Sequence, residues 1–167
     1  MLNIIRADLE RSEHQHAVVT LINAYSMDPM GNGKPLSKEV LNAMVPGLRR
    51  LPTTNIFLAS VNEKFVGIAV CFLGFSTFAA KPLLNIHDLA ILPEYRGQGI
   101  GRQLLTDIAR EARKMGCCKL TLEVLENNHR ARKLYESFGF AHVVYQKTAG
   151  GALFFSKNLL HKGEKAI

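Results

Sequence analysis

The chain has 167 residues, 47% of them hydrophobic, and a formal net charge of +7. This length and composition predict one globular domain, residues 1–160, and a polar tail, residues 161–167. No apolar run approaches the ~18 residues of a membrane span, and the N-terminus turns charged too early for a secretory signal. We therefore expect a cytoplasmic protein with no membrane partner.

The cysteines and the excess of basic residues narrow the function classes. Cys71, Cys117 and Cys118 are an odd number without C-x-x-C spacing, so neither a disulfide framework nor a metal site is expected. The positive charge suits a polyanionic small molecule or nucleic acid. Because the basic residues lie beside apolar positions of predicted helices instead of forming a long run, nucleic acid is the weaker alternative.

The first half of the chain predicts two helices between strands. Ser12 and Gln15 have the capping-box spacing of a helix start, and Ser37 is the expected N-cap of a second helix. Between the two helices, residues 27–33 contain a proline and two glycines, which interrupt regular structure. The predicted elements are a strand over 2–6, helices starting at 12 and 37, and a hairpin of strands 56–61 and 65–75.

Residues 86–105, IHDLAILPEYRGQGIGRQLL, are the most informative stretch. An apolar strand over about 84–91 ends before Pro93, whose nitrogen cannot donate to a sheet ladder. A glycine-rich turn follows, and an apolar stripe then predicts a helix over 101–115. Glycines at alternate positions and the start of a helix can turn several N–H groups toward one anion, best a phosphate or pyrophosphate. The expected site consists of Arg96, Gly97, Gln98, Gly99, Ile100, Gly101 and Arg102.

Two common phosphate motifs do not fit this turn. In the dinucleotide fingerprint G-x-G-x-x-G the third glycine would fall on Arg102, and the Gly-Lys-Ser/Thr of a P-loop is absent.

The rest of the chain predicts an alternating strand over 118–125, a helix from Asn128 to Gly139, and a last hairpin of 140–146 and 152–158. This order indicates an α/β (mixed α+β) fold with a twisted mixed sheet of about seven strands flanked by about four helices.

Two motifs resemble the GNAT N-acetyltransferase family. The turn matches its acyl-CoA pyrophosphate pattern, Arg/Gln-x-x-Gly-x-Gly/Ala, at Arg96, Gly99 and Gly101. A second pattern, N-x-x-A-x-x-L-Y-x-x-x-G-F, lies at the expected separation further along the chain. Its positions are filled by Asn128, Ala131, Leu134, Tyr135, Gly139 and Phe140. The resemblance covers nearly the whole chain, since the predicted order of strands also agrees.

The resemblance implies a fold and a co-substrate, acetyl-CoA, with no metal. The sheet is expected to splay open between strands 84–91 and 118–125, and the pantetheine arm to lie in that opening. Its amides would pair with the main chain of Leu89, Ala90 and Ile91, as an added strand does. The pyrophosphate would bind the N–H groups from Arg96 to Arg102. Asn128 would contact the pantetheine arm, although its residue type equally suits a plain helix N-cap.

Acetyl transfer to an amine also requires acid and base groups. The family pattern places Tyr135 where a proton donor serves the departing thiolate. The base is expected to be Asp88 or Glu123, with His87 a third candidate. Because successive strand residues point to opposite faces, we expect only one of His87 and Asp88 to face the opening.

The predicted function is transfer of an acetyl group from acetyl-CoA to a primary amine of a small molecule or peptide. The acceptor should be bound by residues 25–36, the second helix and the last hairpin loop, with Asp28 suited to attract a cationic amine. The alternatives are a non-catalytic CoA-binding sensor or partner domain and a basic nucleic-acid binder. Many members of the family form homodimers, and the sequence does not show which surface would pair.

Overall fold

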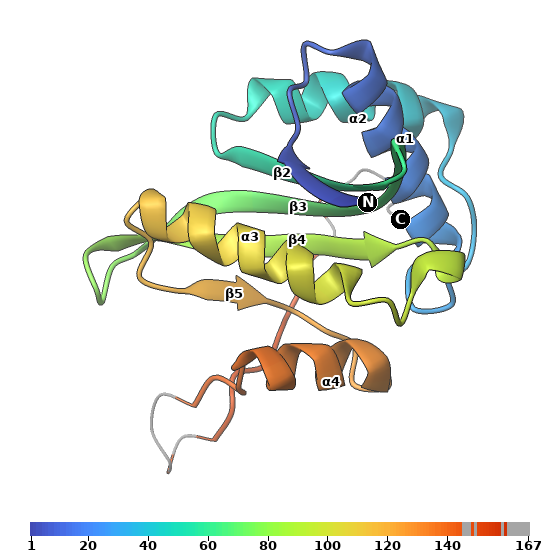
Figure 1. Ribbon diagram of the computed structural model, residues 1–167. Helices are drawn as coiled ribbons and strands as arrows, with labels where there is room; N and C mark the ends of the chain where they lie inside the picture. The colour runs from blue at the N-terminus through green and yellow to red at the C-terminus, as the bar shows by residue number, and fades with distance from the viewer. Residues whose placement is uncertain (145–147, 149, 158, 160–167) are drawn as a thin grey trace.

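A five-stranded sheet forms the centre of this computed structural model, which describes residues 1–144, 148, 150–157 and 159 (Figure 1). The strands follow one another across the sheet in chain order. The first four pair antiparallel, and the last pairs parallel to the fourth. The strands are β1 (Leu2–Arg6), β2 (Thr54–Val61), β3 (Lys64–Ser76), β4 (Lys81–Ile91) and β5 (Leu120–Leu122).

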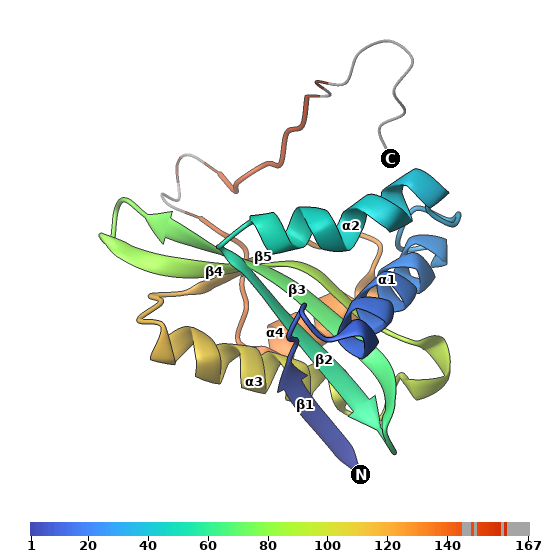
Figure 2. The same cartoon turned by 90° about the horizontal axis from the view of Figure 1, so that it is seen from above.

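Helices cover both faces of the sheet, as Figure 2 shows from above. One face carries α1 (Ser12–Met27) and α2 (Lys38–Arg50). The other carries α3 (Ile100–Lys114) and α4 (His129–Phe138), and the short 3-10 helix η1 (Pro93–Tyr95) precedes α3. No helix among the described residues is long and apolar enough to cross a membrane. The mixed α+β architecture predicted from the sequence is confirmed.

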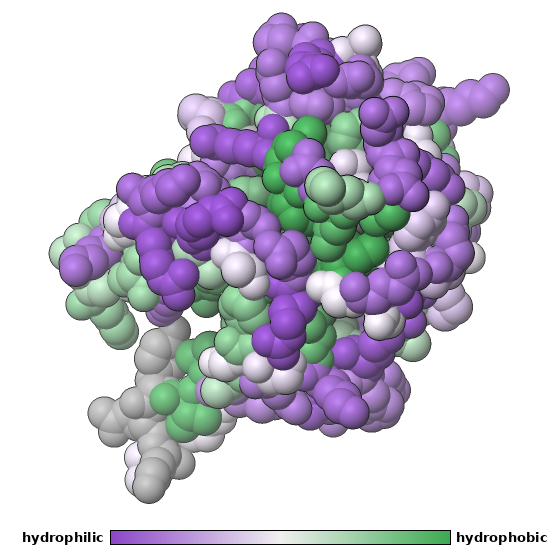
Figure 3. Space-filling view, viewed as in Figure 1, coloured by the Kyte–Doolittle hydropathy of each residue, from purple (hydrophilic) through white to green (hydrophobic). Residues whose placement is uncertain are grey.

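Each face of the sheet has its own apolar core. Under α1 and α2, Val18, Leu58 and Ile68 are fully buried. Under α3, Leu104 and Leu105 are fully buried against β3 and β4. Burying one such side chain stabilises the fold by about 1.5–3 kcal/mol. In Figure 3 the outer faces of the helices are hydrophilic, and hydrophobic residues show between them over the strands.

The helix starts agree only in part with the sequence. Ser37 caps α2 as predicted, because its hydroxyl accepts the Val40 N–H at 3.3 Å. The prediction of a capping box at the start of α1 is wrong, because Arg11 is the N-cap and its side chain makes no capping hydrogen bond. The Gln15 side-chain amide instead donates to the carbonyl of Leu9 at 2.8 Å. An amide that reaches the preceding loop carbonyl is not available for the reciprocal bond of a capping box.

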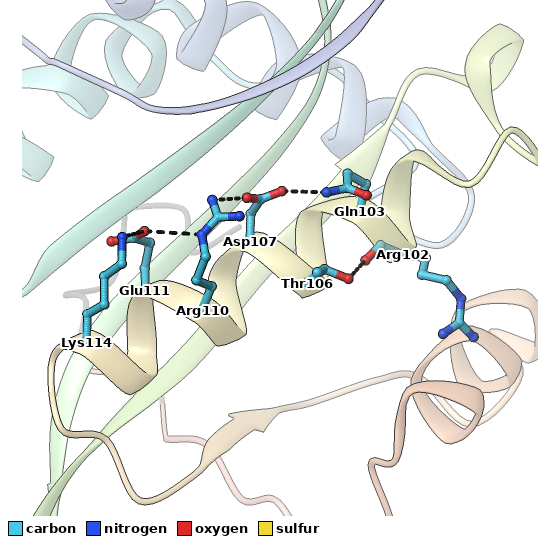
Figure 4. Close-up of polar contacts among 7 residues, drawn as sticks. All are labelled: Arg102, Gln103, Thr106, Asp107, Arg110, Glu111 and Lys114. Atoms are coloured by element: carbon cyan, nitrogen blue, oxygen red, sulfur yellow. Dashed lines mark hydrogen bonds and ion pairs between the residues drawn. The ribbon is translucent and has the colours of Figure 1, made fainter.

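Outside the two cores, α3 satisfies its own polar groups. Asp107 is buried, and its carboxylate accepts from the Gln103 side chain at 2.9 Å and pairs with Arg110 (Figure 4). One turn further, Lys114 pairs with Glu111 at 2.8 Å. Residues three or four apart lie on one helix face, so this polar row extends along α3 without help from another element.

The sequence overestimates the strands after α3. The strand predicted over 118–125 is shortened to Leu120–Leu122. Residues 140–144 and 152–157 form no strand, and the Ala152 N–H to Val143 carbonyl bond at 3.1 Å joins these segments. Phe155 is 83% exposed there, and a hairpin without a covered apolar face is only marginally stable. The described sheet therefore has five strands, and residues 145–147, 158 and the predicted tail 161–167 lie outside the described residues.

Candidate functional site

The sheet opens beside the second half of β4. β3 pairs with β4 as far as Ile91. On the other edge, β5 pairs with β4 only from Leu84 to Ile86. The edge of β4 from His87 to Ile91 therefore faces no strand among the described residues. Main-chain groups of Leu89, Ala90 and Ile91 lie along this stretch, where the sequence places the opening for the pantetheine arm.

A β-bulge lies where the pairing of β5 ends. Val70 of β3 faces Asp88, and its neighbour Cys71 faces Ile86, so His87 is an extra residue. A bulge reverses the alternation of side chains along a strand. Ile86 lies in the α3 core before the bulge, and Leu89 lies on that same face after it. The two residues between them therefore both point to the face of α1 and α2.

The expectation that His87 and Asp88 point to opposite faces is thus wrong, and the extra residue is the reason. The His87 ring packs edge-on against Phe72, with centroids 5.5 Å apart, and Phe72 belongs to the core of the α1 and α2 face. Burial raises the pKa of Asp88, while the neighbouring His87 opposes that shift. Burial disfavours the charged carboxylate, so Asp88 binds a proton more readily than a surface aspartate.

Tyr25, in the last turn of α1, is close enough to Asp88 and to Tyr135 to interact electrostatically with both. Its pKa is raised first by burial and then by the charges of Asp88 and Asp28. Tyr135 on α4 is 8% exposed, and burial together with Tyr25 raises its pKa to about 12. Its ring meets Phe140 edge-on at 5.8 Å. Side chains of β4 and of α4 are therefore both near Tyr25 of α1.

The glycine turn has a backbone conformation that glycine favours. Gly97 and Gly99 have φ of 78° and 81°, and a Cβ at either position would meet open space. Gly99 is the N-cap of α3, and the first N–H groups of a helix have no carbonyl one turn earlier. These donors and the positive end of the helix dipole suit a phosphate.

Gly101 has a further role that the motif does not reveal. A Cβ there would lie 2.9 Å from Cδ2 of Leu134 on α4. That distance is shorter than side chains tolerate without moving. The small residue therefore also leaves room for the Leu134 side chain of α4 to pack against the start of α3.

The two arginines that flank the turn are bound by other protein groups. The Arg96 guanidinium donates to the Ile91 carbonyl at 2.8 Å and to Asp28 Oδ2 at 2.6 Å. Arg102 turns toward α4 (Figure 4) and donates to Ser137 Oγ at 2.7 Å. Asp28, expected to attract the acceptor amine, is instead neutralised by Arg96. For an anion at this turn, the available donors are therefore mainly main-chain N–H groups.

The profile of the Acetyltransferase (GNAT) family matches residues 19–140 of this chain, which is more than half of its length. The chain belongs to this family. The matched region runs from α1 to the end of α4, and so includes the β4 bulge, the glycine turn and Tyr135.

The relatives are named N-acetyltransferases. The Bacillus subtilis protein "Uncharacterized N-acetyltransferase YycN" is 34% identical over 110 residues, which are 63% of this chain and 67% of that protein. The thialysine N-epsilon-acetyltransferase of Bos taurus is 38% identical over 74 residues, 44% of this chain and 43% of that protein. The chain thus matches less than half of the bovine relative. The crystal structure of a probable acetyltransferase has the same fold, with TM-score 0.77 and 23% identity over 93% of this chain and 99% of that one.

Two of the predicted site residues, one from the second motif and one a candidate base, have ordinary structural surroundings. Asn128 is the N-cap of α4 and accepts the Ala131 N–H at 3.2 Å, so its alternative interpretation is confirmed. Its contact with the pantetheine arm stays a prediction. Glu123 was expected on a strand but follows the last residue of β5 and is exposed. Its role as a base also stays a prediction, without the strand that was to orient it.

Tyr25 was expected only as the first residue of the acceptor segment 25–36, and its closeness to Asp88 and Tyr135 was not predicted. A tyrosine near the end of a helix most often has a packing role. The position of Tyr25 just before the break at 27–33 was the available signal, because the end of a helix that faces a loop is where binding residues often lie. Among the described residues, no three His, Cys, Asp or Glu side chains are grouped as a metal site.

Proposed function

We propose that this GNAT protein is an acetyl-CoA-dependent N-acetyltransferase that acetylates a primary amine of a small molecule or peptide. The observation that carries the proposal is the end of β4–β5 pairing at Ile86. It leaves the edge of Leu89 to Ile91, just before the glycine turn, without a neighbouring strand on that side among the described residues, and Asp88 and Tyr135 would act there. Family membership supports the reaction type.

The residues of the turn and of β4 fit the co-substrate. Acetyl-CoA supplies an acetyl group already activated as a thioester. Main-chain N–H groups from Gly97 to Arg102 would hold its diphosphate, because glycine leaves their approach open. The edge of Leu89 to Ile91 would hold the pantetheine amides as a neighbouring strand would. Asn128 would add its side-chain NH2, since its oxygen is occupied by the helix cap.

Asp88 is the base that these surroundings favour. An alkyl ammonium group has a pKa near ~10.4 and must lose a proton before it can attack. Asp88 points to the α1 and α2 face, and its raised pKa brings it closer to the neutral range in which a general base is effective. Glu123 is exposed and follows β5, and His87 is exposed beside Phe72. These two remain the alternatives.

Two further groups would complete the reaction. A main-chain N–H between Leu89 and Ile91 would donate to the thioester oxygen as it gains negative charge. Tyr135 would donate its phenol proton in a hydrogen bond to the departing sulfur. Its high pKa, about 12, keeps the phenol protonated at every pH at which the protein would work.

Binding and turnover test the proposal in two steps. Calorimetry should show binding of CoA to the folded protein. A thiol-release assay with acetyl-CoA should then show turnover on at least one amine of a panel of thialysine, lysine, spermidine, an aminoglycoside and short peptides. Binding without turnover on any amine would instead favour the CoA-sensor alternative. Absence of CoA binding would refute the proposed function.

A further inference from the structure

The Arg96 side chain joins two segments that are 68 residues apart in the sequence. Its Nε donates to the carbonyl of Ile91 at the end of β4, and its terminal nitrogen contacts Asp28 Oδ2 at 2.6 Å. The side chains are 23% and 10% exposed, respectively. A charge-assisted hydrogen bond shielded in this way is stronger than a surface ion pair. The guanidinium therefore fastens the segment after α1 to the strand and turn that form the proposed CoA site.

The segment after α1 is itself tightly folded. Main-chain N–H groups of Gly31 and Asn32 donate to the carbonyls of Asp28 and Ser26 at 2.8 and 2.9 Å. The Met30 N–H donates to Asp28 Oδ1 at 2.8 Å, so one carboxylate binds both its own loop and Arg96. A Cβ at Gly31 would collide with the carbonyl oxygen of Tyr25. A displacement of Asp28 would therefore also displace the loop and the last turn of α1.

That last turn carries Tyr25, whose pKa is raised in part by Asp88 and which in turn helps to raise the pKa of Tyr135. The Asp28 N–H donates to the Tyr25 carbonyl at 3.0 Å, so the two residues are linked directly. The charge of Arg130, from the first turn of α4, also acts on Asp28. In Figure 1 the loop after α1 lies next to the end of β4 and to η1. Asp28 is thus the point where the acceptor side and the CoA side of the proposed site meet.

We propose that Asp28 and Arg96 are positioning residues that hold the 28–34 loop and Tyr25 against the CoA turn, so that CoA binding orders the acceptor side. Arg96 would then serve the acceptor loop through Asp28, and the diphosphate would depend on main-chain donors. The inference rests on the proposed function, because it requires CoA to bind at the glycine turn. It adds Asp28, Arg96 and Tyr25 to the residues that organise acceptor binding.

Hydrogen exchange of the 28–36 peptide, measured with and without CoA, tests this coupling without knowledge of the acceptor. Arg96→Gln removes the guanidinium, whereas Asp28→Asn removes the charge but keeps an oxygen for the Met30 N–H. In the wild type, CoA should slow exchange in this peptide at least about threefold. Either variant should speed exchange about tenfold and abolish the effect of CoA. The double variant should be no faster than either single one, as expected for residues that act as a pair.

Calorimetry on the same proteins separates the possible failures. CoA affinity should stay within about threefold of wild type in both variants. A matched control is Arg49→Gln, which breaks the exposed Arg49–Glu10 pair at 2.5 Å and should not change exchange in the peptide. If Arg96→Gln weakens CoA binding tenfold and Asp28→Asn does not, Arg96 is a phosphate ligand and the inference is wrong. It is also wrong if CoA binds the wild type without slowing the peptide. If CoA does not bind at all, the proposed function itself fails.

Discussion

Replacing Tyr135 by phenylalanine should slow the chemical step by a moderate factor that the pKa of this residue sets. Its phenol has a pKa of about 12, whereas an alkyl thiol such as cysteine has a pKa of ~8.5. Complete transfer of the proton from Tyr135 to a thiolate would be uphill by roughly 3.5 pKa units, or about 5 kcal/mol. Tyr135 is therefore better suited to stabilise the departing sulfur by a hydrogen bond than to protonate it fully.

A hydrogen bond to a charged group contributes about 1.5–3 kcal/mol, which corresponds to roughly 10- to 150-fold in rate. Tyr135→Phe should lower kcat by this factor and leave the KM for acetyl-CoA nearly unchanged. The aromatic ring and its contact with Phe140 would remain, so the fold should not suffer. Full general acid catalysis would contribute ~10²–10⁴-fold, and its loss would be correspondingly larger.

Single-turnover thiol release at saturating acetyl-CoA is the appropriate assay, because it isolates chemistry from product release. Tyr95→Phe is the matched control: it removes another phenol, from η1, whose ring lies under Lys64, and should retain the wild-type rate. A loss below about threefold in Tyr135→Phe would show that the phenol does not contact the leaving sulfur. A loss above about a thousandfold would refute the argument from the pKa, since a hydrogen bond alone could not account for it.

The remaining predictions concern Asp88 and the glycines. Because burial raises the pKa of Asp88 in the folded state, the folded protein binds this proton more tightly, and the associated stability is lost as pH rises through the folded pKa. Asp88→Asn should therefore be more stable than wild type in urea unfolding at pH 8, and this difference should shrink toward pH 3. If Asp88 is the base, the acidic limb of the pH profile of kcat/KM should also disappear in this variant. A difference in stability that is the same at both pH values would contradict the raised pKa. Gly31→Ala should lower stability by about 1–3 kcal/mol, since its Cβ collides with main chain. Gly47→Ala, in α2 with open space around it, should raise stability by about 0.5–1 kcal/mol and Tm by ~2–4 °C. A higher Tm for Gly31→Ala or a lower Tm for Gly47→Ala would refute the packing argument.

The sequence predicts the elements that local rules determine. Ser37 caps α2, Gly139 with φ of 102° ends α4, and the glycine turn has the left-handed residues that its spacing required. Each of these features depends on a few consecutive residues, whose types strongly favour one local backbone conformation. The same reasoning fails at Glu123, where an alternating pattern continues past the end of β5. Alternation shows what a strand would look like, but pairing decides where the strand stops.

The site residues required information that no local pattern contains. Arg96 matches the phosphate motif, yet its guanidinium is bound by a residue 68 positions earlier. The extra residue at His87 arises from the register of β4 against β3, and register is a property of two strands together. Without the bulge, one of the His87 and Asp88 side chains would lie in the α3 core, on the face away from Tyr25.

The bulge also accounts for why the site lies where it does. The pairing of β5 with β4 ends at Ile86, and the alternation of side chains along β4 reverses at the next residue, His87. A bulge bends its strand and increases the local twist, which turns the following edge away from a straight neighbour such as β5. The same local irregularity thus opens the main chain of Leu89 to Ile91 and places His87 and Asp88 on the same face of the sheet. A variant that deletes His87 should restore regular pairing and leave Asp88 opposite Val70 on the face of α1 and α2. We expect it to lose activity because the strand edge closes, even though His87 itself contacts no reacting atom.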